Sequence, residues 1–343
     1  MAPKKAATKA KATRGGNDNS TKNEGSSGTP AEEPKAVKDK VDEKPNHEEQ
    51  AKPNPDQEAS KKRSKAASAE EPRKASRRSG RGASKGEPST QQLLNYLLSP
   101  AAAELTRPDE EVEDLKSRGD IRTYSASALN VFEELLCAVI LSRPISHRLG
   151  LRTIRTVLNE PYNFTSARAV QDAGNEKRLQ AVYEARTQHK DKTAAQMGDI
   201  AKAVLDNFTS GNDKDGTQLQ KLRDECGDDI GKAADMLKSH VKGLGQTGLE
   251  IFFRRVQWIW VESFPNIDGR TADSLRMLGL PQDGEALQKL LEDYWKGVGS
   301  KSWLAGEGDE AKKRRAFVVL LERATGAQLE HKIDDVLAAA AET

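Results

Sequence analysis

The sequence predicts an all-α fold that follows a long, disordered, basic tail, and three observations support this prediction. From Gln91 onward, apolar residues recur at helical spacing. The chain contains no convincing strand pattern, no internal repeat and no glycine-rich nucleotide-binding motif. Residues 1–90 hold no aromatic and almost no large aliphatic residue, so they cannot bury enough apolar surface to offset their chain entropy. Residues 91–343 suffice for one compact unit or two closely packed lobes.

Charge is divided unequally between these two parts. Residues 1–90 hold 21 Lys and Arg against 14 Asp and Glu, a net charge of +7, whereas residues 91–343 hold 34 against 39, a net charge of −5. The part expected to fold therefore lacks the overall positive charge of a generic DNA-binding domain. A local basic patch is still compatible with residues 242–276, which contain Lys242, Arg254, Arg255, Arg270 and Arg276.

The tail contains two basic clusters, KKRSK at residues 61–65 and RKASRR at residues 73–78. This pattern is typical of a bipartite nuclear import signal, would serve equally as an electrostatic DNA tether, and also occurs in tails that only solubilise a protein. We expect a nuclear protein. No apolar run approaches the length of a membrane span, so we expect no membrane partner.

The expected helices follow from apolar periodicity and from turn residues. Leucines at 93, 94, 97 and 98 predict a helix over residues 91–99, and a polar helix is expected near residues 109–118. A helix beginning near residue 127 is apolar over more than half its circumference, which places it centrally in the core, and Pro144 ends it. The remaining helices are expected at residues 146–158, 166–173, 176–185, 193–208, 229–240, 246–261, 271–278, 285–296, 311–324 and 327–341, with loops at 209–216 and 297–308.

The stretch Gly243-Leu244-Gly245 joins two of these helices and predicts a very tight hairpin, because glycine accepts a positive φ at little cost. Such a turn leaves backbone N–H groups free at the start of the next helix, where the helix dipole also favours an anion such as a DNA phosphate. The alternative is a turn that serves packing alone. Arg254 and Arg255 fall outside the apolar stripe of the second helix, so we expect them on a solvated face or against a phosphate.

The sequence gives little indication of a metal site. Cys137 lies in an apolar run and is expected to be a buried small hydrophobe. Two cysteines and widely scattered histidines give no zinc-site spacing, so we expect no metal and no cofactor.

The run FEELLCAVILSRPISHR from Phe132, the hairpin, and Asp268 at 23 residues beyond Gly245 together resemble the helix-hairpin-helix (HhH-GPD) DNA glycosylase superfamily, the endonuclease III-like group. Ile140-Leu141-Ser142 matches the end of that family's apolar helix. The resemblance implies a helical barrel over residues 127–262, with the hairpin at 241–248. A second lobe would combine residues 91–126 and 263–343, and the active cleft would lie between the two.

The resemblance also implies roles for individual residues. Asp268, in Ile267-Asp268-Gly269, matches the carboxylate that stabilises the oxocarbenium-like sugar when the glycosidic bond breaks. The alternative is that Asp268 only caps the following helix. Thr247 stands where lyase members carry the Schiff-base lysine, which implies a monofunctional glycosylase. Arg143, before Pro144, stands near the position where some members insert a glutamine into the DNA stack. The implied DNA contacts are Arg143, Lys242, Gly243, Leu244, Gly245 and Thr247.

The chain departs from the family in two further ways. Two cysteines cannot hold the four-cysteine iron–sulfur cluster of many members, so the chain resembles a divergent branch without the cluster. The second hairpin helix begins GLEIFF from Gly248, which makes the expected pocket wall bulkier than usual.

Three functions are compatible with these observations. The first is a nuclear base-excision DNA glycosylase, acting as a monomer on double-stranded DNA through Asp268. The second is a non-catalytic DNA-binding or chromatin protein that keeps the fold, and the third is a helical interaction module with a purely structural turn. The sequence does not identify the base. Its four tryptophans, Trp258, Trp260, Trp295 and Trp303, suit stacking on a base or burial in the core.

Overall fold

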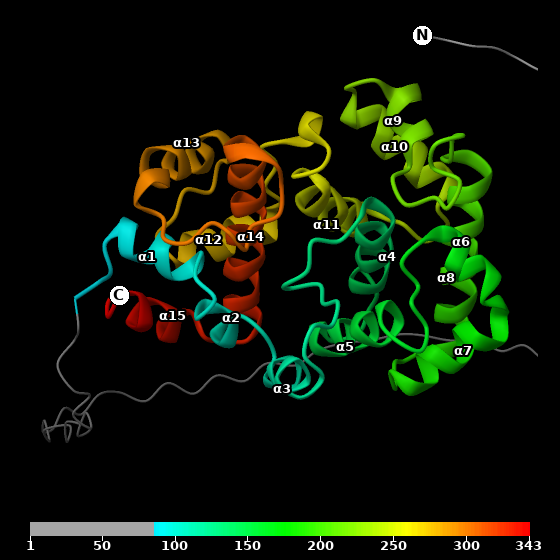
Figure 1. Cartoon of the computed structure of the whole chain (residues 1–343), viewed down its shortest axis with the longest axis horizontal. Helices are drawn as coiled ribbons and strands as arrows, with labels where there is room; N and C mark the ends of the chain where they lie inside the picture. The colour runs from blue at the N-terminus through cyan, green and yellow to red at the C-terminus, as the bar shows by residue number, and fades with distance from the viewer. Residues whose placement is uncertain (1–85) are drawn as a thin grey trace, which may run out of the picture. The chain divides into compact units, whose positions relative to one another are not determined.

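The computed structural model of the chain describes residues 86–343 (Figure 1). Within this range all regular structure is helical, which confirms the all-α class. The predictions for residues 1–85, disorder and two basic clusters, lie outside the described residues. The expected tail reaches slightly too far, because the first helix begins at Thr90.

The described residues form fifteen α-helices and two short 3-10 helices. Their bounds are α1 Thr90–Leu97, α2 Ala102–Leu105, α3 Asp109–Arg118, α4 Val131–Leu141, α5 His147–Leu158, α6 Ala167–Asp172, α7 Gly174–Glu184, α8 Lys190–Asn207, α9 Gln220–Cys226, α10 Ile230–His240, α11 Gln246–Val256, η1 Val261–Ser263, α12 Gly269–Met277, α13 Gly284–Tyr294, η2 Trp295–Gly297, α14 Gly308–Leu329 and α15 Ile333–Ala340.

Many of these helices begin where the sequence supplies a side-chain cap. Ser89 and Gln92 form a reciprocal capping box at the start of α1, and Asn130 and Glu133 form another at the start of α4. Each such cap satisfies backbone N–H groups that have no partner within the helix and contributes about 1 kcal/mol. These local signals fix where the helices start.

The first of two hydrophobic clusters surrounds α4. Ten of its eleven residues are buried, and α4 packs against α5, α8 and α11. The cluster runs from Tyr124 to Trp260 and includes Phe132, Phe164 and Phe252. Truncating a fully buried phenylalanine such as Phe132 to alanine costs about 3–5 kcal/mol, because it leaves a cavity. This cluster therefore fixes α11, the helix that follows the hairpin turn.

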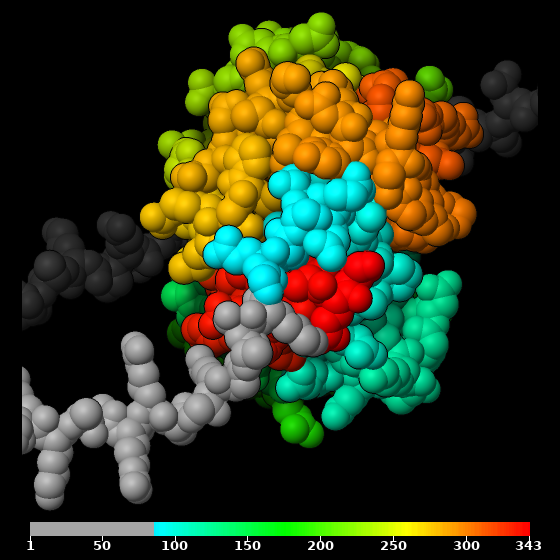
Figure 2. Space-filling view, turned by 90° about the vertical axis from the view of Figure 1, so that its left-hand side faces the viewer, coloured from blue at the N-terminus to red at the C-terminus, as the bar shows by residue number. Residues whose placement is uncertain are grey.

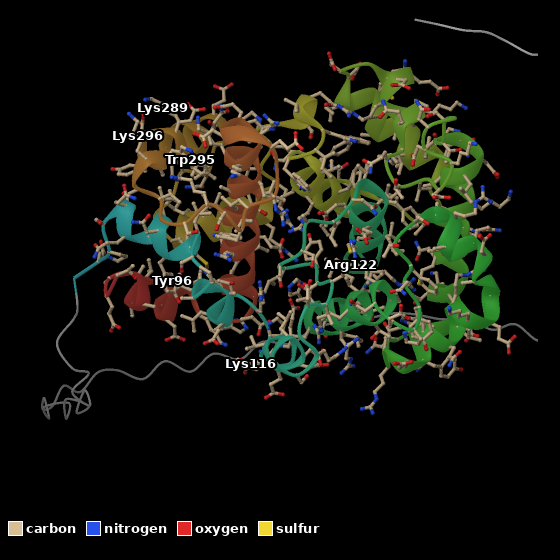
Figure 3. The ribbon with its side chains drawn as sticks, in the orientation of Figure 1. Tyr96, Lys116, Arg122, Lys289, Trp295 and Lys296 are labelled. Atoms are coloured by element: carbon tan, nitrogen blue, oxygen red, sulfur yellow. The ribbon has the colours of Figure 1, made fainter. Side chains whose placement is uncertain are left out.

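The second cluster surrounds α14 and joins chain ends that are far apart in sequence. It combines Leu93–Ala102 with residues from Leu275 to Ala340. Helices α1 and α15 pack against each other, and Figure 2 shows them on one face of the molecule beside α13. Tyr96 of α1 and Trp295 of η2 belong to this cluster (Figure 3). Helix α14 also packs against α11, so the two clusters meet along that contact.

Several elements differ from the sequence prediction. Helices α2 and α9 were not expected, because α2 has only four residues and the segment of α9 is short and polar. Helix α11 ends at Val256, and η1 occupies part of the range assigned to it. The two expected C-terminal helices 311–324 and 327–341 are instead divided near residue 330, because α14 continues through Gly326. That glycine lies against the Thr106 carbonyl, where a side chain would clash, so it serves packing and does not end the helix.

Among residues 86–343, no helix combines the length and the apolar character that crossing a bilayer requires.

Candidate functional site

The hairpin joins α10 to α11 through a short turn whose two glycines differ. Gly243 has a φ of +86°, in the region that favours glycine, and a side chain there would meet Gln196. Gly245 has an extended φ of −95°, which any residue adopts, so the expectation of a positive φ holds at Gly243 alone. Leu244 is buried, with 3% of its surface exposed, and it anchors the turn to the first cluster.

The start of α11 has no side-chain cap from the part of the chain that the structure describes. Gly245 occupies the N-cap position, and no described side chain accepts a hydrogen bond from the first N–H groups of the helix. A Cβ placed on Gly245 would meet no atom of residues 86–343 within 4 Å. Neither conformation nor packing therefore requires glycine at this position. The exposed backbone and the dipole of α11 make this turn suitable for an anion.

Arg143 lies beside the hairpin and reaches it through a residue that the sequence did not single out. Its Nη1 donates to Gln196 Oε1 at 2.6 Å, and Gln196 Nε2 donates to the carbonyl of Lys242 at 3.3 Å. Gln196 stands on α8, 46 residues before Lys242, and no sequence pattern links the two. The structure thus brings Arg143, Lys242 and the turn together.

Asp268 is both a helix cap and one half of a buried ion pair. Its Oδ1 accepts from the Thr271 N–H at 3.1 Å, which caps α12. Its Oδ2 accepts from Thr271 Oγ1 at 2.8 Å and from Arg254 Nη1 at 3.0 Å. Only 8% of Asp268 is exposed. Burial opposes ionisation, but the Arg254 charge and the Thr271 hydrogen bonds outweigh it and lower the pKa of Asp268 below its ordinary value.

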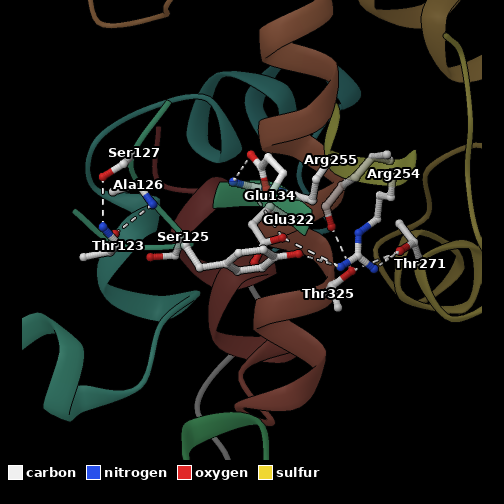
Figure 4. Close-up of polar contacts among 12 residues, drawn as sticks. Thr123, Ser125, Ala126, Ser127, Glu134, Arg254, Arg255, Thr271, Glu322 and Thr325 are labelled. Carbon is white, nitrogen blue, oxygen red and sulfur yellow. Dashed lines mark hydrogen bonds and ion pairs between the residues drawn. The ribbon is translucent and has the colours of Figure 1, made fainter. Parts of the chain in front are cut away.

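The prediction that Arg254 and Arg255 lie on a solvated face or against a phosphate is wrong. They are only 5% and 1% exposed, because α11 packs against both α4 and α14. Arg255 donates to both oxygens of Glu134, at 3.0 and 3.1 Å, and lies 3.6 Å from Glu322. Arg254 also donates to Tyr124 Oη at 3.1 Å. Figure 4 shows this buried network between α4, α11, α12 and α14.

A cavity of about 250 Å³ brings two of the predicted site residues together. It is lined by residues of α4, α5, α11, α12 and α14, namely Leu141, His147, Thr247, Glu250, Ile251, Arg254, Asp268, Arg270, Thr325 and Leu329. Thr247 and Asp268 therefore share one polar pocket where the two clusters meet. Arg143, Lys242, Gly243, Leu244 and Gly245 do not line it.

His147 is the least expected member of this pocket. Burial lowers its pKa to about 4 against the opposing charge of Glu330, and Arg254 and Arg270 lower it further. The imidazole is therefore neutral at physiological pH and offers one hydrogen-bond donor and one acceptor. Its position on the first turn of α5, after Pro144, gave no signal in the sequence.

A second cavity of about 460 Å³ runs along α11 on the side of α10 and the 262–266 segment. It holds none of the predicted site residues. Glu250 lines both cavities, and its Oε1 accepts from Gln246 at 3.0 Å.

The tryptophans do not line the smaller cavity. Trp260 and Trp295 are buried in the two clusters, while Trp258 lies under Arg315 and Trp303 under Arg323. Their contacts are those of core and surface packing.

Neither cysteine has the environment of a reactive thiol. Cys137 and Cys226 are both buried and free, and burial raises the pKa of each. Within residues 86–343, no group of three or more His, Cys, Asp or Glu side chains is arranged to hold a metal ion.

Comparisons of the chain with protein-family models, with curated proteins and with solved structures give no match.

Proposed function

We propose that the chain is a monofunctional DNA N-glycosylase that removes a damaged or mismatched base with the help of Asp268. One observation carries the proposal. Thr247 and Asp268, which the resemblance places at the catalytic positions, line one polar cavity formed by the hairpin helix α11 and the start of α12. An accidental motif match would not require these two residues to share a pocket.

The chemistry of base excision suits the state of Asp268. Breaking the glycosidic bond gives the sugar a positive charge, which an ionised carboxylate stabilises, and the same carboxylate orients the attacking water. The lowered pKa of Asp268 keeps it ionised at neutral pH. The flipped nucleotide would enter a cavity that also presents the neutral His147 imidazole and the Arg270 guanidinium.

The lack of an amine in the cavity supports a monofunctional reaction. Thr247 offers only a hydroxyl, and the described residues that line the cavity include no lysine. Lys242 is exposed in the hairpin turn and does not line the cavity. The cavity therefore offers no lysine amine that could form a Schiff base with the sugar, so strand cleavage by β-elimination is not expected.

The DNA backbone would bind at the hairpin. The N–H groups at the start of α11, the open space at Gly245, and the Lys242 and Arg143 side chains together suit a phosphate. The net charge of −5 over residues 91–343 limits non-specific affinity, and the basic tail would supply the remainder and direct the protein to the nucleus.

A second candidate is a DNA-binding protein without catalysis. The observation that favours it is that Asp268 already has structural partners, since it caps α12 and pairs with Arg254. Such a carboxylate has a role in the fold whether or not a reaction takes place.

The deciding experiment measures base release from duplexes that carry uracil, mismatched thymine, oxidised or alkylated bases. We expect strand breaks only after alkali treatment, and none from Asp268→Asn. The matched control is Asp283→Asn, because Asp283 caps α13 in the same way but is exposed and does not line the cavity. Breaks without alkali would contradict the assignment of Thr247. Equal activity in Asp268→Asn and the wild type would show that Asp268 is not the catalytic carboxylate. DNA binding without base release on any duplex favours the second candidate.

A further inference from the structure

The carboxylate of Asp268 is held asymmetrically. A carboxylate offers about four acceptor sites, two on each oxygen. Oδ2 accepts from both Arg254 Nη1 and Thr271 Oγ1, whereas, among residues 86–343, Oδ1 accepts from the Thr271 N–H alone. Arg254 Nη1 also donates to Thr271 Oγ1 at 3.0 Å, so these three groups form a closed triangle on the Oδ2 side. The remaining acceptor site is on Oδ1.

Arg254 is itself immobilised by partners from other elements. Its Nη2 donates to Tyr124 Oη at 3.1 Å and lies 4.0 Å from Glu322 Oε2. The guanidinium fork is rigid and does not lose its charge, so two fixed ends determine where Nη1 lies. Arg254 therefore ties the orientation of Asp268 to α14 and to the segment before α4.

The ion pair of Asp268 and Arg254 belongs to a buried network in which arginines and carboxylates are equal in number. The buried network holds three arginines, Arg254, Arg255 and Arg315, and three carboxylates, Glu134, Asp268 and Glu322. Arg254 pairs with Asp268 and, at 4.0 Å, with Glu322, while Arg255 pairs with Glu134 and, at 3.6 Å, with Glu322. The other ionisable groups around the cavity are His147 of α5, Glu250 of α11 and Arg270 of α12.

We infer that Arg254 is a positioning residue that, with Thr271, holds Oδ2 of Asp268 and leaves Oδ1 as the oxygen that faces the developing sugar cation and its attacking water. This inference rests on the proposed glycosylase function. It assigns a functional role to a buried arginine that touches no substrate. It also explains why the carboxylate can cap a helix and still offer an acceptor site.

The test compares Arg254→Lys with Arg255→Lys in the full chain. Both substitutions remove a buried guanidinium from the same network and the same helix, but only Arg254 contacts Asp268. Thr271→Val is a second variant, since it removes the other Oδ2 donor and keeps the N–H that caps the helix. Thermal melts establish that each variant folds.

Two measurements are needed. The first is the titration of the Asp268 carboxyl by carbon NMR, assigned by the signal that Asp268→Asn loses. The second is the affinity for duplexes with a cationic pyrrolidine or a neutral tetrahydrofuran in place of one nucleoside. The wild type is expected to prefer the cationic duplex. Arg254→Lys and Thr271→Val should raise the pKa of Asp268 and reduce this preference by about tenfold, the effect of one charge-assisted hydrogen bond. Arg255→Lys should change neither.

The outcomes separate the two ideas. An unchanged Asp268 titration in Arg254→Lys, or equal changes in Arg254→Lys and Arg255→Lys, overturns the positioning role alone. Equal affinity of the wild type for the two duplexes overturns the glycosylase proposal, and the positioning role with it.

Discussion

At the scale of single residues, the most consequential arrangement is the buried ion pair of Asp268 with Arg254 on the wall of the smaller cavity. Removing one partner of a buried ion pair costs about 3–5 kcal/mol, because the other charge is left without compensation. Arg254 keeps Tyr124 and Glu322 as neighbours, which places the expected loss near the lower end of that range.

The first prediction concerns the pH dependence of stability. The fold lowers the pKa of Asp268, so its contribution is present above the unfolded value near 4 and is lost as the pH falls below it. Asp268→Asn should therefore reduce the free energy of unfolding by about 3 kcal/mol at pH 6, and by progressively less below pH 4. Urea denaturation across this pH range measures the difference. Asp283→Asn should change stability by less than about 0.5 kcal/mol, because asparagine and aspartate cap helices equally well.

The second prediction separates the two hairpin glycines. Gly243→Ala should lower stability by about 1–3 kcal/mol, because alanine is strained at a φ of +86° and its Cβ would meet Gln196. Gly245→Ala should leave the melting temperature unchanged, since the position has an extended φ and open space. If a phosphate approaches this backbone, Gly245→Ala should still weaken DNA binding in a fluorescence anisotropy titration. Unchanged affinity would argue against the hairpin as the phosphate site.

At the scale of elements, the bridge from α8 to the hairpin turn connects two segments that the sequence does not relate. Gln196 holds both Arg143 and the Lys242 carbonyl, so it aligns the arginine with the turn. The third prediction is that Gln196→Ala weakens DNA binding several-fold while it costs only about 0.5–1.5 kcal/mol of stability, the net value of a hydrogen bond. Gln180→Ala, an exposed change on the neighbouring α7, is the control and should alter neither property. Equal DNA affinity of both variants would contradict a role for Arg143 at the hairpin.

The sequence predicted the class of the fold and most of its helices because their signals are local. Capping residues such as Ser146 and Ser166 mark where helices start, and the apolar density of α4 marks the core. The arginines of α11 were misplaced because periodicity identifies an apolar stripe but not a helix enclosed on both sides. In the sequence, Gly326 indicates the end of a helix. Its packing role is visible only in the structure, where the Thr106 carbonyl lies against it.

The candidate site was predictable only in part. The resemblance singled out Thr247 and Asp268, and the structure places both in one cavity. His147 and Gln196 were not predicted and Arg254 was predicted wrongly, because the contacts of each involve residues distant in sequence. Arg254, for example, donates to Tyr124, 130 residues away. Such contacts are products of tertiary packing, which no local pattern records.

At the scale of the whole molecule, the uneven distribution of charge has a measurable effect. The fourth prediction is that the DNA affinity of the full chain falls more steeply with salt than that of residues 86–343. The tail carries the excess of lysine and arginine, and each phosphate that it neutralises adds about 0.9 to the slope of log affinity against log salt. Titrations from about 50 to 200 mM salt measure both slopes. Equal slopes would show that the tail does not contact DNA.

The buried network where the two clusters meet constrains how this sequence can change. Glu134 and Arg255 are each almost fully enclosed, so altering either one alone strands a charge in a place that water cannot reach. Replacing both with apolar side chains of similar volume is often neutral or stabilising, although here it would also leave Glu322 to pair with Arg254 without Arg255. Each single variant is therefore expected to be less stable than both the wild type and the double variant. We therefore expect substitutions at Glu134 and Arg255 to be tolerated when they occur together, although 121 residues separate the two positions.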